Sequence, residues 1–108
     1  VKKMKNLKPD EKEKLETVEK LALELMKEHN VSHYNFKFGY GWTYAGMCTE
    51  ISIIVQYNFV LKHNIEEIKN TVLHEIAHAI VGPGVGHHIE WQNKAKELGV
   101  KFHKNYRK

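Results

Sequence analysis

The chain has 108 residues, of which 42% are hydrophobic and 28% charged, a composition typical of one small globular domain. Its net charge of +4 is too modest for a protein dedicated to coating DNA, and no apolar run approaches the roughly 18 residues that cross a bilayer. A single cysteine, Cys48, excludes a disulfide framework within the chain and a cysteine-rich zinc ribbon.

Two features bear on the cellular compartment. Residues 1–16 are basic and then mixed in charge, without the apolar stretch of a secretory signal. The lone Cys48 is interpreted as a small buried hydrophobic residue, as expected where thiols stay reduced. We therefore expect an intracellular protein, cytoplasmic or nucleoid-associated, or nuclear in a eukaryote, with no membrane contact.

The first predicted element is an amphipathic helix within residues 8–30. Asp10 is the expected N-cap, and Glu13 stands three residues later, as in a capping box. One face repeats at a spacing of three to four residues and consists of Leu15, Val18, Ala22, Leu25 and, at its end, His29. This pattern predicts a helix that packs on a core.

Strand-like sequence follows the first helix. Residues 33–40 alternate, and the apolar side of the alternation consists of Tyr34, Phe36 and Phe38. Residues 51–60 are β-branched and aromatic, as in a buried strand, and two glycines within 41–50 permit a turn or a bulge. We predict two or three strands that form one small antiparallel sheet.

A second helix is predicted over residues 65–81. Asn64 is a good N-cap with Glu67 at the capping-box position, and Gly82 followed by Pro83 ends the helix. Its expected core face consists of branched apolar residues, namely Ile65, Ile68, Val72, Ile76 and Ile80.

A last helix is predicted over roughly residues 88–99 and ends at Gly99. Trp91, Ala95 and Leu98 share one face of it. Trp91 is interpreted as a core anchor that locks this helix in place.

The second predicted helix carries the pattern H-E-x-x-H as His74, Glu75 and His78. Residues four apart lie one turn apart on the same side of a helix, so the two imidazoles point toward one place. Neutral imidazole is a good ligand for Zn²⁺. Glu75 is rotated by about 100° from His74, so it can border the ion as a general base for a bound water.

A catalytic zinc ion takes three protein ligands, so a third ligand must come from elsewhere in the chain. One common zinc-peptidase pattern places a histidine six residues after the second motif histidine, but that position is Gly84. The candidates that follow are His87, His88 and Glu90. Because adjacent helical residues point about 100° apart, only one histidine of the pair can readily face the ion. Glu90 can alternatively accept a hydrogen bond from the other nitrogen of a ligand.

A donor near the developing oxyanion would complete such a site. Tyr44 and Tyr57 are available for this role, and packing in or beside the sheet is the alternative interpretation of both. The remaining histidines are interpreted as surface residues: His29, His33, His63 and His103.

Residues 70–99, NTVLHEIAHAIVGPGVGHHIEWQNKAKELG, resemble the SprT-like (Spartan-like) zinc metalloprotease family. The shared features are a motif helix of the form HEIAHA, a loop with glycine, and a histidine four residues before an aromatic, here His87 and Trp91. With the upstream strand-then-helix layout, the likeness covers about residues 45–100. The resemblance implies that His87 is the third ligand beside His74 and His78, and that Glu75 is the catalytic base.

The resemblance also implies a fold and an activity. The fold is α+β, one compact zincin-like domain over residues 1–108, with a small antiparallel sheet packed on the N-terminal helix and the motif helix. A following helix delivers the third ligand. The implied activity is that of an endopeptidase with one catalytic Zn²⁺, acting on DNA-bound or DNA-crosslinked proteins with DNA as activator or scaffold. We expect a monomer. The rival interpretations are a non-proteolytic zinc-binding module, a nucleic-acid interaction module whose histidines are incidental, and a hydrolase of non-peptide bonds.

The C-terminal tail, residues 101–108, has four cations and no acid: Lys101, Lys104, Arg107 and Lys108. Its cations can contact phosphates, and the interleaved Phe102 and Tyr106 can stack on bases. The tail is therefore the predicted nucleic-acid contact, and a solvated terminal segment is the alternative.

Overall fold

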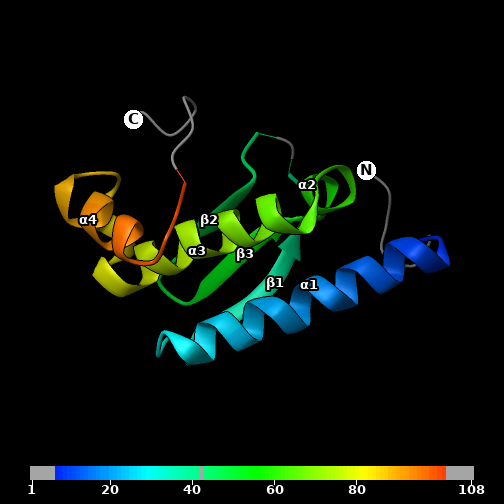
Figure 1. Ribbon diagram of the computed structural model, residues 1–108, viewed down its shortest axis with the longest axis horizontal. Coiled ribbons are helices and arrows are strands. Elements are labelled where there is room, and N and C mark those ends of the chain that lie inside the picture. The colour runs from blue at the N-terminus through cyan, green and yellow to red at the C-terminus, as the bar shows by residue number, and fades with distance from the viewer. Residues whose placement is uncertain (1–6, 42, 102–108) are drawn as a thin grey trace.

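The computed structural model describes residues 7–41 and 43–101 of the chain. Within this part, helices and short strands follow one another in an α+β order (Figure 1): α1 Pro9–Glu28, β1 Asn35–Gly39, β2 Gly46–Cys48, β3 Ser52–Gln56, α2 Tyr57–Lys62, α3 Ile65–Val81, a 3-10 turn Pro83–Val85, and α4 Ile89–Glu97. α3 crosses the sheet beside α1, and α4 packs on the far end of α3 (Figure 1). The chain is thus α+β, as the sequence predicts.

The sheet is mixed, so the prediction of an antiparallel sheet is wrong. Its strand order is β1-β3-β2, with β1 parallel to β3 and β2 antiparallel to β3. The short turn between β2 and β3 reverses the chain, whereas the longer connection after β1 carries it to the opposite edge of the sheet. Alternation of side chains tells which residues face the core, but it is the same for both strand directions.

The predicted alternation in β1 is confirmed. Phe36 and Phe38 pack against the core, where they pair in register with Ile53 and Val55 of β3. β3 is shorter than the predicted strand, because the chain from Tyr57 onward forms helix α2. In α2, Tyr57 and Val60 are fully buried at helical spacing, so tertiary packing overrides the β propensity of these residues.

The N-cap of α1 lies two residues before the predicted N-cap Asp10. Lys8 is the N-cap and Pro9 occupies the first helical position, where its fixed φ and missing N–H fit a helix start. The side chain of Glu11, not Glu13, reaches back: its Oε1 accepts a hydrogen bond of 3.0 Å from the Lys8 backbone N–H. The predicted core face is confirmed, since the buried residues include Leu15, Val18, Ala22 and Leu25.

α3 has the predicted boundaries. Asn64 Oδ1 accepts from the Glu67 N–H at 2.8 Å, and Glu67 Oε1 accepts from the Asn64 N–H at 3.2 Å, which forms the capping box. At the other end Gly82 adopts a φ of 109°, which a residue with a side chain rarely takes. The predicted core residues of the middle turns are fully buried, but Ile65 and Ile80 are 41% and 37% exposed because the helix ends extend past the sheet.

The middle of α3 is buried. All eight residues from Thr71 to His78 are buried, including His74, Glu75 and His78 of the motif. The sheet covers one side, and Trp91 and Ala95 of α4 cover another. The histidine motif is therefore buried within the domain and meets the partly exposed His87.

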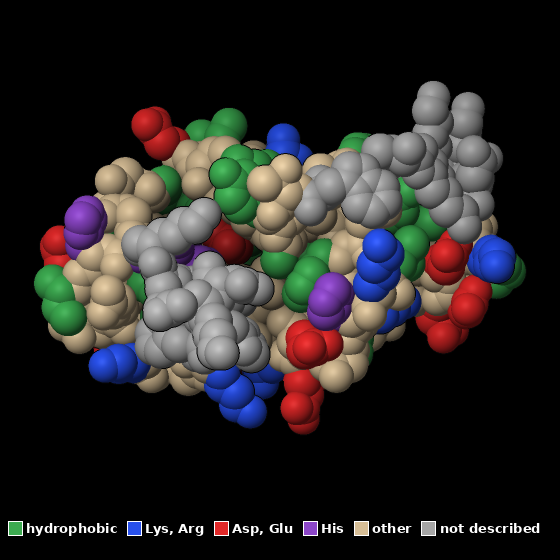
Figure 2. Space-filling view, turned by 90° about the horizontal axis from the view of Figure 1, so that it is seen from above, with side chains coloured by type: hydrophobic (Ala, Val, Ile, Leu, Met, Phe, Trp, Pro, Cys, Tyr) green, Lys and Arg blue, Asp and Glu red, His purple; other side chains and the backbone are tan. Residues whose placement is uncertain are grey.

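The face of the molecule seen in Figure 2 is mixed in charge. On the face seen in Figure 2, acidic and basic side chains lie among exposed hydrophobic ones. None of the described helices is long and apolar enough to cross a membrane.

Gly46 in β2 sets the distance between the sheet and α3. A Cβ at this position would lie 2.9 Å from the Ile54 carbonyl oxygen and 3.2 Å from Thr71 Cγ2. We predict that Gly46→Ala lowers the free energy of unfolding by about 1–3 kcal/mol, because the added methyl group overpacks this contact. Denaturant unfolding measures the change. The matched control is Gly84→Ala, where a Cβ meets nothing within 4 Å; equal effects of the two substitutions would contradict the prediction.

Candidate metal centre

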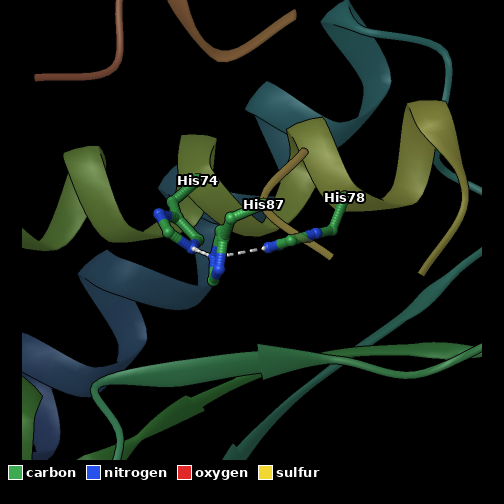
Figure 3. A group of neighbouring side chains, drawn as sticks. All are labelled: His74, His78 and His87. Atoms are coloured by element: carbon green, nitrogen blue, oxygen red, sulfur yellow. Dashed lines mark hydrogen bonds between the residues drawn. The ribbon is translucent and has the colours of Figure 1, made fainter. Parts of the chain in front are cut away.

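Three imidazoles converge at one point between α3 and the segment that precedes α4. α3 presents His74 and His78 one turn apart, and His87 approaches between them from the segment after the 3-10 turn (Figure 3). The Nε2 atom of His87 lies 3.2 Å from His74 Nε2 and 3.2 Å from His78 Nε2. The ligand atoms of all three residues lie within 4.8 Å of one another, so the group could hold a metal ion.

The two distances from His87 Nε2 fit ligands of a tetrahedral ion. Two nitrogens bound to one Zn²⁺ at about 2.05 Å in tetrahedral geometry are about 3.3 Å apart. Hydrogen bonding alone satisfies the cluster poorly, because a neutral imidazole has one N–H and His87 Nε2 cannot donate along both 3.2 Å contacts. A cation shared by three lone pairs explains both contacts at once.

Burial keeps the two motif histidines neutral. It lowers the pKa of His74 to about 3, with smaller contributions from His78 and His87. The pKa of His78 is lowered to about 4 by burial and then by His87. At neutral pH both imidazoles are therefore uncharged and hold a free lone pair for a metal ion, which is the form that binds metals.

Glu75 stands beside the three nitrogens. Its side chain is 5% exposed, and its Oε2 lies 3.8 Å from His74 Nε2. Since His74 is neutral, this contact is not an ion pair. Burial raises the pKa of Glu75 to about 8. On its other side, the Cγ atom of Glu75 lies 3.4 Å from the place a Gly46 Cβ would occupy, so the side chain is held between the sheet and the histidines.

The three candidates for the third ligand are placed differently. His87 reaches the other two histidines, whereas His88 and Glu90 are exposed, and neither belongs to the histidine group. The third ligand is expected on the following helix. His87 instead lies one residue before His88, the N-cap of that helix. The positive φ of 71° at Gly86 turns the chain at this point.

The interpretation of Trp91 as a core anchor is confirmed by its complete burial, but the sequence does not reveal its other contacts. Its ring lies against His74, His78 and His87, and its Nε1–H donates a 3.2 Å hydrogen bond to the His74 carbonyl oxygen. The one feature of the sequence that links Trp91 to the histidines is its position four residues after His87.

The other predicted residues do not belong to the histidine group, or they lie outside the described residues. Tyr44 is 60% exposed and Tyr57 is fully buried in the core. Cys48 is half-buried on β2, and burial followed by the charge of Glu75 raises its pKa to about 12, so its thiol is neutral. Lys101 is exposed. The predicted nucleic-acid contacts Lys104, Arg107 and Lys108 lie outside the described residues.

No protein-family model matches the chain, and no curated protein matches it significantly. Among solved structures, the crystal structure of the metallopeptidase zymogen of Methanocaldococcus jannaschii, jannalysin, is similar in fold, with a TM-score of 0.64. The likeness covers 82% of this chain and 85% of that one at 16% sequence identity. At this identity it shows a shared fold, that of a metallopeptidase.

We predict that the chain binds one Zn²⁺ and that His87→Ala weakens or abolishes binding, because only two nitrogens then remain. Metal binding to the folded state raises the melting temperature, and Zn²⁺ should no longer stabilise the variant. Thermal unfolding with and without Zn²⁺, together with metal analysis after gel filtration, measures both effects. His88→Ala and Glu90→Gln are the matched controls and should behave as the unsubstituted chain. If one of these controls loses zinc binding while His87→Ala keeps it, the third ligand is the residue replaced in that control.

Proposed function

We propose that the protein is a zinc-dependent endopeptidase in which His74, His78 and His87 hold the ion and Glu75 is the catalytic base. The observation that carries the proposal is the convergence of three imidazoles, with His87 Nε2 lying 3.2 Å from both His74 Nε2 and His78 Nε2, and a buried carboxyl group 3.8 Å from His74 Nε2. Three protein ligands are the number that catalytic zinc sites use. The likeness to a metallopeptidase fold supports the same conclusion.

Each residue has a defined part in the proposed reaction. When bound, the zinc ion supplies Lewis acidity, which acidifies water and polarises a carbonyl group. Glu75 Oε2 accepts a proton from the attacking water and then donates it to the nitrogen of the leaving amine. Burial alone raises the pKa of Glu75 to about 8. A zinc ion bound beside it would favour the ionised carboxylate, the form that can accept a proton.

The surroundings of Glu75 prepare it for this role. Its carboxyl group is enclosed by α3 and β2, so little water competes for its oxygens. A zinc site that only holds the fold together has no use for a buried carboxyl group at this place, so the arrangement favours an enzyme over a structural zinc module.

We further propose membership of the SprT-like family and action on proteins bound or crosslinked to DNA. The support for this is the sequence likeness over about residues 45–100 and the basic, aromatic tail. In this proposal DNA is the activator or scaffold that brings the enzyme and its protein substrate together.

We predict that Glu75→Gln lowers the rate of peptide cleavage by about 10²–10⁴-fold, because the amide cannot accept the proton of the attacking water. Zinc binding should persist, since the three imidazoles are unchanged. The assay follows cleavage of an unfolded protein with zinc, with a chelator, and with each variant. Glu90→Gln, an exposed carboxylate three residues after His87, is the control and should cleave normally. Full activity of Glu75→Gln with zinc bound would refute the mechanism, and a zinc-bound chain that cleaves nothing would support the non-proteolytic module.

A second prediction concerns the tail. Replacing Lys104, Arg107 and Lys108 together by Ala should weaken DNA binding and reduce the slope of log K against log salt by about 0.9 for each phosphate that the tail no longer neutralises. Substitution is preferable to deletion, because the Lys101 backbone exchanges two hydrogen bonds with the Asn70 side chain. Binding is measured by fluorescence anisotropy at several salt concentrations. Replacing Lys12, Lys20 and Lys27, three exposed lysines of α1, by Ala is the control with the same loss of positive charge. An unchanged slope for the tail variant would remove the tail from the proposed DNA contact.

A further inference from the structure

The indole of Trp91 lies against all three imidazoles of the candidate metal centre. Its ring centroid is 4.6 Å from that of His74, 4.6 Å from that of His87 and 5.1 Å from that of His78. Trp91 is fully buried. One rigid side chain therefore forms a common floor beneath the three residues that converge on one point.

Each ring meets the indole at a different angle. The His78 ring is stacked, with an interplanar angle of 23°, the His74 ring is tilted at 59°, and the His87 ring stands edge-on at 80°. Offset-stacked and edge-on arrangements are the favourable ones for aromatic pairs. The indole thus restrains three ring planes in the directions in which their Nε2 atoms meet.

His78 depends on this restraint. A histidine that binds a metal ion usually donates its second nitrogen to a carboxylate, a carbonyl or a water, which fixes the ring plane. His78 Nδ1 is buried and has no hydrogen-bond partner within residues 7–41 and 43–101. In the described part of the chain, the orientation of this ring therefore rests on packing, and its stacked partner is Trp91.

α4 also holds the backbone of two of the three histidines. Trp91 Nε1–H donates to the His74 carbonyl oxygen at 3.2 Å, which ties α4 to the motif helix. The next residue, Gln92, donates from Nε2 to the His87 carbonyl oxygen at 2.9 Å. Two adjacent side chains of α4 thus connect α3 and the segment that carries His87, so the relative position of the ligands depends on this helix.

We propose that Trp91 is a positioning residue of the metal centre, which orients the rings of His74, His78 and His87 toward one shared ion, and that Gln92 assists it by holding the His87 backbone. The proposal rests on the proposed zinc site. It has an electronic component as well: imidazoles that share a cation become electron-poor, and an electron-poor ring is attracted to the face of an indole.

The experiment uses Co²⁺ as the probe, because its visible absorption reports the geometry of the ligands. Affinity is measured by competition with a chromophoric chelator, and folding by circular dichroism and thermal unfolding. Trp91→Leu should weaken Co²⁺ binding by about 10- to 100-fold, the usual effect of removing a group that orients metal ligands, and should shift the visible bands. Trp91→Phe keeps an aromatic ring and should recover part of the affinity.

Two controls separate positioning from stability. Met26→Ala removes a fully buried side chain from a different helix, α1, and should lower the melting temperature while leaving Co²⁺ affinity and spectrum unchanged. Gln92→Ala should weaken Co²⁺ binding less than Trp91→Leu, whereas Asn93→Ala, its exposed neighbour on α4, should have no effect.

A folded Trp91→Leu variant with the affinity and spectrum of the unsubstituted chain would overturn the proposal. If this variant does not fold, Trp91→Phe decides, because it lacks the N–H donor and part of the ring surface; unchanged affinity and spectrum would then refute the positioning role. Failure of the unsubstituted chain to bind one Co²⁺ would refute the metal centre itself. Co²⁺ binding without peptide cleavage would refute the proposed endopeptidase activity. The comparison of the Trp91 variants with the unsubstituted chain would still test the positioning role.

Discussion

The burial of residues 71–78 is the constraint on which the rest of the site depends. Enclosure of a whole helical segment is ordinary for apolar residues, but here it includes His74, Glu75 and His78. A low-dielectric setting disfavours charge, so it lowers the pKa of the two histidines and raises that of the glutamate. Burial therefore keeps His74 and His78 neutral and raises the pKa of Glu75 to about 8 before any ion is bound.

Two elements close on this buried segment from different sides. On the sheet side, Gly46 lets β2 approach α3 so closely that Glu75 is held in place. On the opposite side, Trp91 of α4 packs against all three imidazoles and bonds the motif helix through the His74 carbonyl. Because the base and the ligands depend on different neighbours, the chemistry of the site is coupled to the packing of the whole domain.

The sequence predicts the local features of the fold well and the non-local ones poorly. The Asn64 capping box and the end of α3 at Gly82 are short-range signals, and both are confirmed. The direction of β1 relative to β3 and the helix that begins at Tyr57 are not predicted. Parallel and antiparallel strands share one alternation pattern, and the β-branched and aromatic residues after Gln56 adopt a helix because Tyr57 and Val60 are thereby buried.

The sequence by itself determined which groups can act and that three of them share one helix. The spacing of His74, Glu75 and His78 follows from the helical period, which is a local property of the chain. Only the tertiary structure decided which of His87, His88 and Glu90 reaches the pair, and that Trp91 lies beneath all three histidines. That outcome depends on the chain reversals at Gly82 and Gly86 and on the docking of α4 against α3. These contacts join residues 9 to 17 positions apart, which the helical period by itself does not bring together.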